Sequence, residues 1–274
     1  MNLNNGILNL DLELKGGEMS RLTYKGYDVL YRGDGKYWSG KNPTLFPFIS
    51  SPNEKKYEYK GKTYPCKNHG LIRYATLSLK EESKDRVVMV LNSNEETLKE
   101  YPFDFEYEIT YSLDNNKVLI NYKITNKSKD IMPFTFGLHP GFIVRNFDEA
   151  YIEFPNDEKG ELFNQLDRST SIVKLKDYHN FIDDVNRLQT VIFKNLKSDY
   201  VILRMKEYSV KVDKKSFKYL ALWTPHQDSG FMCIEPWLSI NDIKPSNNPF
   251  KEDFELEYLK SNESYNINYY IELI

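Results

Sequence analysis

The chain has 274 residues, and its 37 Lys and Arg nearly balance its 40 Asp and Glu, which leaves a formal net charge of −3. A nucleic-acid-binding surface needs a concentration of basic residues, so this balance argues against nucleic acid as a partner. Hydrophobic residues make up 40% of the chain, which excludes wholesale disorder and suffices for a sizeable core. No apolar run approaches the ~18 residues of a membrane-spanning helix, so we expect no membrane partner either.

The expected location is the cytoplasm. The first residues, MNLNNGILNLDLEL, have neither a basic start nor a long apolar stretch, so no signal peptide is evident. Cys66 and Cys233 are the only cysteines, which is too few for a disulfide framework. A reducing compartment is the default for such a chain.

Strands dominate the first third of the chain. In residues 8–14 four leucines alternate with polar residues, which predicts a half-buried strand, and Gly16 and Gly17 predict a turn after it. Residues 87–91 are continuously apolar, so we expect a strand that is buried on both faces. The charged residues 80–86 before it are interpreted as a solvated turn between strands.

The clearest local signal is a hairpin in the middle of the chain. Residues 105–113 and 118–124 both alternate between apolar and polar side chains, and the polar residues 114–117 separate them. Two half-buried strands around a short polar break predict a β-hairpin. Residues 265–273 alternate in the same way and predict a strand that closes the chain.

Helical periodicity is scarce. Residues 181–188 (FIDDVNRL) predict a short helix or turn, with Asp183 or Asp184 as its N-cap. Polar, glycine-containing or proline-containing segments predict further turns, among them residues 156–160 and 245–249.

The pattern as a whole predicts an all-β fold with one large antiparallel domain that spans residues 1–274. The chain contains no long Ser/Gly/Pro linker, no shift in composition and no clean repeat that would divide it. Aromatic residues reach 15%, which favours strands over helices. Aromatic rings also suit carbohydrate binding, although for any single ring core packing is the commoner explanation.

The first of three candidate sites is the segment NHGLIR at residues 68–73. Gly70 permits a left-handed backbone or a close approach to a ligand. His69 and Arg73 flank it and supply a titratable donor and a cation. The alternative is an ordinary turn with an exposed histidine and a surface arginine.

The second candidate site is the segment FTFGLHPGF at residues 134–142. In a strand its two first phenylalanines and its leucine share one face, so Gly137 and His139 lie on the other. We expect Gly137 to leave room for a ligand, and Pro140 to hold His139 in an extended backbone. Histidine is the usual general acid near neutral pH. The alternative is a satisfied histidine at a strand end.

The third candidate site is the segment FMCIEPW at residues 231–237. Glu235 is a carboxylate in an otherwise apolar strand, which is costly unless the charge is paired or used. Burial there raises the pKa of a carboxyl group and makes it a stronger base. Trp237 is a candidate wall of the binding site. The alternative is a carboxylate that binds a backbone N–H or an arginine.

Other chemistry has little support. Cys66 and His69 have the C-x-x-H spacing of a zinc ligand pair, but no second pair follows at a suitable distance, so we expect no metal site. Nucleotide-binding glycine motifs and the G-x-S-x-G motif of serine hydrolases do not occur. His179 and His226 stand in polar contexts and are interpreted as surface residues.

The three candidate sites, in this order and spacing, resemble the aldose 1-epimerase (galactose mutarotase-like) superfamily, and most closely its LacX-like branch, to which hexose-6-phosphate mutarotases are related. The resemblance rests on the segments PTLFP (43–47), HGLIR (69–73), YPF (101–103), GLHPGF (137–142) and CIEPW (233–237). It implies a large twisted β-sandwich with the active site on its concave face. It also implies that His139 is the general acid, that Glu235 is the general base, and that His69 and Arg73 bind the sugar.

One position departs from the family pattern. The family usually continues its Leu-Phe-Pro segment to a Gly-Arg pair whose arginine reaches the sugar, whereas Ser51 stands at about that place here. An arginine there would bind hydroxyls or a phosphate in bidentate fashion, which serine cannot do. A phosphorylated sugar is therefore the less favoured substrate.

The resulting hypothesis is a mutarotase that interconverts the anomers of an aldohexose by two proton transfers, with no cofactor. The acid and the base are expected on opposite sides of the C1–O5 region of the sugar. Asp228 and Asp242 are candidates for binding hydroxyls, or equally loop carboxylates and caps. Two alternatives stay open: a non-catalytic sugar sensor, and a lyase or hydrolase that acts on polysaccharides. Either a monomer or a homodimer is compatible with the sequence.

Overall fold

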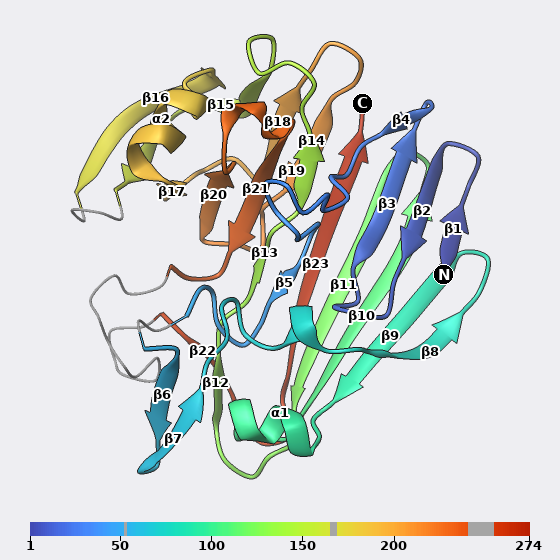
Figure 1. Ribbon diagram of the computed structural model, residues 1–274, viewed down its shortest axis with the longest axis vertical. Coiled ribbons are helices and arrows are strands. Elements are labelled where there is room, and N and C mark those ends of the chain that lie inside the picture. Colours follow the sequence, from blue (N-terminus) through green and yellow to red (C-terminus); the bar gives the residue numbers. More distant parts are fainter. Residues whose placement is uncertain (52–53, 165–168, 241–254) are drawn as a thin grey trace.

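The computed structural model describes residues 1–51, 54–164, 169–240 and 255–274. Across these ranges most residues lie in strands, as the all-β prediction requires (Figure 1). The described part contains two short α-helices, α1 (Glu95–Glu100) and α2 (Phe181–Leu188). No helix of the described residues has the length and apolar character that crossing a membrane requires.

One long antiparallel sheet organises the molecule. Its strands lie in the order β5 (Thr44–Leu45), β13 (Gly137–Leu138), β21 (Phe231–Trp237), β20 (Tyr219–Trp223), β17 (Val191–Lys194), β15 (Tyr151–Phe163), β18 (Tyr200–Arg204), β19 (Val210–Asp213), β23 (Ser264–Leu273), β11 (Lys117–Asn126), β10 (Phe105–Asp114), β9 (Arg86–Asn92) and β8 (Ser78–Glu82). Two strands leave this path, because β14 (Gly141–Ile143) also pairs with β21 and β16 (Thr170–Tyr178) pairs with β15. Sheets of this length curl, since each strand is twisted relative to the next.

A smaller sheet packs in front of the β9–β11 region (Figure 1). It consists of β1 (Asn2–Asn4), β2 (Leu8–Leu12), β3 (Met19–Tyr24) and β4 (Tyr27–Asp28). Two antiparallel two-stranded sheets complete the described strands: the hairpin of β6 (Lys56–Tyr59) with β7 (Lys62–Pro65), and the long-range pair of β12 (Met132–Phe134) with β22 (Glu257–Leu259).

The space between the sheets is filled by one large apolar cluster, which we call the main core. Leu10 and Leu22 from the small sheet and Ile109 and Ile271 from the long sheet all belong to it and are fully buried. The hydroxyl of Tyr111 donates a hydrogen bond of 2.7 Å across the layers to a backbone carbonyl in the turn between β2 and β3. This packing gives the molecule its two layers.

The predictions from period-two alternation are confirmed. β10 and β11 form the expected hairpin, and its last pair, Asp114 with Lys117, encloses a two-residue turn. The strand predicted over residues 265–273 is β23, whose apolar residues are buried alternately. The apolar run at residues 87–91 lies in β9 and is buried on both faces except for the half-buried Val90.

Two turn predictions are wrong. Residues 156–160 lie inside β15, where the register shifts between Glu153 and Glu158 instead of the chain reversing. Glu158 is buried, and its carboxylate accepts hydrogen bonds from the backbone N–H groups of Lys197 and Ser198, which satisfies a charge that the sequence placed in solvent. Residues 80–82 belong to the exposed strand β8, so the predicted solvated turn is shorter than residues 80–86.

The helices differ from expectation at their N-termini. α2 covers the predicted residues, but its N-cap is Asn180, because the helix begins at Phe181 and places Asp183 and Asp184 inside its first turn. α1 was not predicted. It begins with a capping box in which the Asn94 side chain accepts from the Thr97 backbone and the Thr97 hydroxyl accepts from the backbone N–H of Asn94. The predicted turn at residues 245–249 lies outside the described residues.

Candidate active site

Strand β21 presents Glu235 to the side of the sheet that faces away from the main core. Met232 and Ile234 belong to the main core, whereas Cys233 belongs to a separate cluster on the opposite side. Glu235 shares that side because side chains alternate along a strand. Its side chain is 1% exposed.

His139 meets Glu235 from the adjacent chain segment. It lies between β13 and β14, both of which pair with β21, and the backbone N–H of Ile234 donates a hydrogen bond to the carbonyl of Pro140. His139 Nε2 lies 3.3 Å from Glu235 Oε2, and its residue is 7% exposed. The sequence motifs that suggested an acid and a base are therefore brought into contact. The two groups lie side by side, closer together than the sequence interpretation assumed.

Burial sets the protonation of this pair. It lowers the pKa of His139 well below its usual range, and the nearby His69 and Arg73 lower it further. Burial also raises the pKa of Glu235 well above its usual range. The indole N–H of Trp237 acts against that rise without forming a hydrogen bond of normal geometry. Both groups thus favour their neutral forms.

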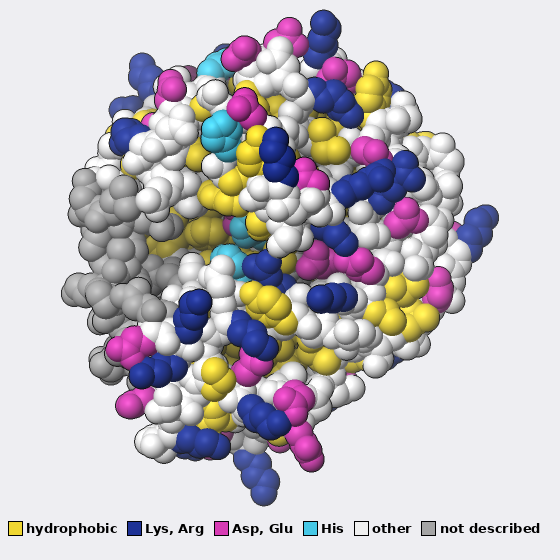
Figure 2. Space-filling model, in the orientation of Figure 1, with side chains coloured by type: hydrophobic (Ala, Val, Ile, Leu, Met, Phe, Trp, Pro, Cys, Tyr) yellow, Lys and Arg dark blue, Asp and Glu magenta, His cyan; other side chains and the backbone are white. Residues whose placement is uncertain are grey.

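Aromatic rings enclose the imidazole of His139. The ring of Trp38 stacks on it with centroids 4.8 Å apart and an interplanar angle of 25°. Trp223 meets the same imidazole edge-on at 5.6 Å, and His69 does so at 5.5 Å. Figure 2 shows histidine and hydrophobic side chains gathered on the floor of a hollow in this face. Trp38 was missed from the sequence, because it lies in a loop with no periodic pattern.

His69 is held in a defined orientation by a paired backbone contact. The backbone N–H of Ser50 donates to His69 Nδ1 at 3.1 Å, and the backbone N–H of His69 donates to the carbonyl of Ser50 at 2.9 Å. Burial, with the charge of Arg73 as a smaller cause, lowers the pKa of His69 to about 3. A neutral imidazole that accepts at Nδ1 carries its proton on Nε2, so His69 is a ready hydrogen-bond donor.

Arg73 lies in a short 3-10 helix (Ile72–Tyr74) close enough to act on the pKa of both histidines. Its guanidinium stacks over the ring of Tyr74 at 5.2 Å. It makes no hydrogen bond or ion pair to any residue that the structure describes. Five N–H donors are therefore available for a ligand. The structure thus places His69 and Arg73 of the segment 68–73 near His139, and their role in binding stays a prediction.

The position of Trp237 contradicts the expectation that Gly137 leaves room for a ligand. A Cβ at Gly137 would lie 2.7 Å from the Trp237 ring and 3.1 Å from the Ile49 side chain. The space beside Gly137 is therefore filled by protein side chains, and the prediction that it admits a ligand is wrong. Trp237 itself is 5% exposed and packs in a small cluster with Leu45 and Tyr219.

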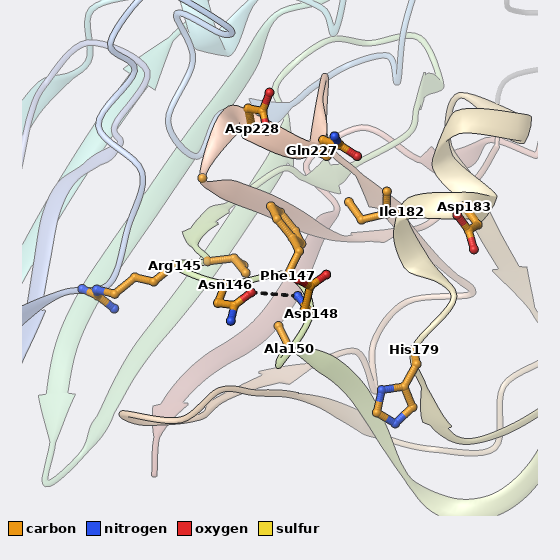
Figure 3. Close-up of a pocket in the computed structure, with 12 residues that line it drawn as sticks. Arg145, Asn146, Phe147, Asp148, Ala150, His179, Ile182, Asp183, Gln227 and Asp228 are labelled. Atoms are coloured by element: carbon orange, nitrogen blue, oxygen red, sulfur yellow. Dashed lines mark hydrogen bonds between the residues drawn. The ribbon is translucent and has the colours of Figure 1, made fainter.

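The two aspartates differ in what the structure says of them. Asp242 lies outside the described residues. Asp228 is exposed, and its backbone N–H donates to Nδ1 of His226. It lines a cavity of about 820 Å³ between the chain after β14, α2 and the loop before β21 (Figure 3). Neither His139 nor Glu235 lines that cavity, so Asp228 is not placed with the pair.

The same cavity is lined by His179, whose position at the surface was another prediction. His179, interpreted from sequence as a surface residue, is exposed and lines the cavity, with its ring stacked on Tyr151 at 4.6 Å. Arg145 also lines it, but its guanidinium is already bound to the hydroxyl of Tyr208 and to a backbone carbonyl. The aromatic rings around His139, Glu235 and the guanidinium of Arg73 lie outside this cavity.

The described residues that could bind a metal ion lie at His139 and Glu235 rather than at Cys66 and His69. Cys66 does not pair with His69, and its thiol donates to the carbonyl of Lys67 at 3.7 Å. Among the residues that the structure describes, one group of three potential ligands was found: His139, Cys233 and Glu235, with ligand atoms within 4.8 Å of one another.

Comparisons with known proteins agree with this geometry. A family model described as aldose 1-epimerase matches residues 1–272. The chromosomal and plasmid LacX proteins of Lactococcus lactis subsp. lactis are each 25% identical over 262 residues, which cover 87% of this chain and 87% of each relative. The resemblance found in the sequence motifs is thereby confirmed.

Solved structures show the same fold. A galactose mutarotase related enzyme from Lactobacillus acidophilus and a galactose mutarotase-like protein from Lactobacillus casei ATCC 334 each give a TM-score of 0.89 at 24% identity. The match covers 100% of this chain and 97% and 99% of those chains. The predicted large, twisted antiparallel β-sandwich is confirmed. Since the family model spans nearly all its residues, the chain belongs to the aldose 1-epimerase family and is an isomerase with a mutarotase-type function on a sugar.

Proposed function

We propose that this protein interconverts the α and β anomers of a free aldohexose, with Glu235 as general base and His139 as general acid. The observation that carries the proposal is the 3.3 Å separation of His139 Nε2 and Glu235 Oε2 in a buried site. O1 and O5 of a pyranose are bonded to the same carbon. Two adjacent groups on one side of the sugar therefore suffice to reach both oxygens.

The reaction needs two proton transfers in each direction. Glu235 takes the proton of the O1 hydroxyl while His139 protonates O5, and the C1–O5 bond breaks to give the open-chain aldehyde. Rotation about C1–C2 presents the other face of the carbonyl. Reclosure returns the proton from Glu235 to O1 and the proton from O5 to His139, which restores both groups.

Other residues of the site are proposed to position the sugar. The unpaired guanidinium of Arg73 and the Nε2–H of His69 are donors for sugar hydroxyls. Trp237 stands next to the general base and is proposed to limit its contact with solvent. Asp242 belongs to this proposal on sequence grounds alone.

The test is anomer exchange followed by NMR or polarimetry with glucose, galactose and their 6-phosphates. We expect Glu235→Gln and His139→Asn each to slow exchange by roughly 10²–10⁴-fold, the usual contribution of a general acid or base. His179→Asn, a histidine of the separate cavity, is the matched control and should leave the rate unchanged. Equal rates for the wild type and Glu235→Gln on every sugar would refute the catalytic assignment. A clear preference for the 6-phosphates would refute the free sugar as substrate.

A further inference from the structure

We propose that His139, Cys233 and Glu235 form a binding site for a thiophilic divalent cation of the zinc class, and that occupation of this site switches the enzyme off. The inhibitory effect rests on the proposed function, because the cation would occupy both the acid and the base. The binding itself does not depend on that function. Cys233 has no part in the proposed proton transfers, so its presence beside the pair calls for a separate explanation.

The arrangement has the geometry of a three-ligand metal site. An imidazole nitrogen, a thiol sulfur and a carboxylate oxygen lie within 4.8 Å of one another, and the nitrogen–oxygen edge is 3.3 Å. Zn²⁺ with tetrahedral bonds of roughly 2.0–2.3 Å needs ligand edges of roughly 3.3–3.8 Å, so the nitrogen–oxygen edge already fits and a side-chain adjustment of about 1 Å brings the remaining edges into range. Three protein ligands with an open fourth position are the pattern of zinc sites that retain an exchangeable ligand.

The backbone fixes these ligands independently of any metal. Cys233 and Glu235 are two residues apart on β21 and therefore project from the same side. Cys233 pairs with Gly141 of β14 and with Trp223 of β20, so its strand is held from both sides. His139 lies two residues before β14. A cation would thus meet ligands whose backbone positions are already fixed.

The carboxylate of this site is an unpartnered buried group. Glu235 Oε2 has no hydrogen-bond partner among the described residues, although the side chain is 1% exposed. Nδ1 of His139 also has none. Buried polar atoms in native proteins are nearly always satisfied, and an exception calls for a strained contact, a functional role, a water or an ion to explain it. A sugar is one such ligand, and the adjacent thiol makes a soft cation another.

The charge balance favours a divalent ion over a monovalent one. The three side chains are buried, and a thiolate and a carboxylate together carry two negative charges. Their complex with M²⁺ and a neutral imidazole therefore has no net charge. The positive charge of Arg73 nearby opposes binding, and the neutral balance limits that penalty.

Cobalt(II) added to the metal-free full chain tests the site directly. Thiolate coordination to Co²⁺ gives a ligand-to-metal charge-transfer band in the near ultraviolet, so we expect that band to saturate at one equivalent per chain. Cys233→Ala should abolish the band and weaken Co²⁺ binding by more than the ~10–100-fold seen for outer-shell ligand partners. Cys66→Ala removes the other buried cysteine and should leave the band intact.

Zn²⁺ titration of anomer exchange tests the regulatory part. We expect Zn²⁺ to inhibit the wild type and Cys66→Ala at the concentration that displaces Co²⁺, and to inhibit Cys233→Ala at least about tenfold more weakly. Each variant is compared with its own rate in a chelator. If Cys233→Ala does not fold, the wild-type band and its loss on Zn²⁺ addition decide the matter. Absence of the band in the wild type, or its survival in Cys233→Ala, overturns the site. A bound metal in a protein without anomerase activity would instead overturn the proposed function.

Discussion

In the proposed mechanism, His139 and Glu235 have one titratable proton between them, which can lie on either group. Burial favours the neutral state, with the proton on Glu235 and none on His139. In the proposed reaction, the state that opens a closed sugar has the proton on His139 instead, and the two states differ by the transfer of that one proton. The proposed reaction converts one state into the other, because Glu235 gains a proton as His139 gives one away. A sugar hydroxyl can assist the charged state by replacing water as its hydrogen-bond partner.

The pH profile of kcat/KM follows from this single proton. Because the pKa of His139 is lowered, the pair takes up a second proton only below the usual imidazole range; because the pKa of Glu235 is raised, it loses its last proton only above the usual carboxyl range. We expect a bell-shaped profile whose two limbs belong to the pair. In the Glu235→Gln variant, the pH profile of the residual activity should lack the limb that is due to the carboxyl group. A profile that is flat wherever the protein stays folded would contradict a proton-sharing pair.

Glu18 makes a separate prediction about stability. It is 9% exposed, and burial raises its pKa from 4.5 to about 7, against a hydrogen bond from the backbone of Asn42. A raised pKa means that the folded state holds the proton more tightly than the unfolded state does. The stability that results is fully present below pH 4.5 and is lost as the pH rises through about 7. The change that Glu18→Gln makes to the free energy of unfolding should therefore be more favourable at pH 8 than at pH 4. The difference between the two pH values should be up to about 3 kcal/mol. Urea unfolding at both pH values measures this difference, and an effect independent of pH would contradict it.

At the scale of elements, the site depends on a turn that the chain adopts only with glycine. Gly70 has a φ of +74°, and a Cβ there would lie 2.1 Å from the carbonyl oxygen of Phe46. The same carbonyl accepts a hydrogen bond from the backbone of Leu71, and Phe46 and Gly70 form an isolated β-bridge. This contact places the preceding His69 against Ser50. The turn thus connects local backbone geometry with the orientation of the His69 imidazole.

Gly70→Ala should displace His69 and reduce activity. The positive φ and the clash with a backbone atom together should cost about 1–3 kcal/mol, and the shift of the turn should raise KM. Gly61→Ala is the matched control, because Gly61 has the same φ of +74° but an added Cβ would meet nothing within 4 Å. It should lose some stability and keep KM. Equal KM values for the two variants would show that the Phe46 contact does not orient His69.

Elements were predictable where local periodicity and burial agree. The hairpin of β10 and β11 has one apolar and one polar face, so its sequence alternates and its strands could be predicted. Residues 156–160 are polar and contain a glycine, yet they continue β15, because Glu158 finds backbone donors in a segment far along the chain. No local pattern contains that information. The short helix α1 was hidden for a different reason, since six residues are too few for a periodic signal.

The residues of the site also divide into those that a local sequence pattern indicated and those that only the tertiary structure brings together. Glu235 could be selected as a candidate because a carboxylate in an apolar strand is unusual, and His139 because its strand has an apolar face opposite to it, while their acid and base roles came from the family resemblance. Trp38 could not, because its stacking on His139 depends on how the loop after β4 folds back. Cys233 was visible as a neighbour of Glu235, but its grouping with His139 requires the pairing of β14 with β21.

At the scale of the whole molecule, the last strand joins the two parts of the long sheet. β23 pairs with β11 on one side along most of its length and with β19 on the other. In the strand order, the strands next to His139 and Glu235 lie on the β19 side of β23. The strands against which the small sheet packs lie on its β11 side. The C-terminal strand therefore holds a central position in the sheet, and the fold is complete only when it has paired.

Deletion of residues 264–274 should consequently prevent folding. Ile267, Tyr269, Ile271 and Leu273 are all buried, and at about 1.5–3 kcal/mol for each side chain their loss approaches the entire stability of a typical domain. Deletion of residues 1–5 is the control, because β1 is an edge strand of the small sheet and buries only Leu3 within its bounds. We expect the control to melt cooperatively at a reduced temperature, and the C-terminal deletion to show no cooperative transition by near-ultraviolet circular dichroism. A C-terminal deletion that melts like the control would mean that β19 and β11 can hold the two parts of the sheet together without the strand between them.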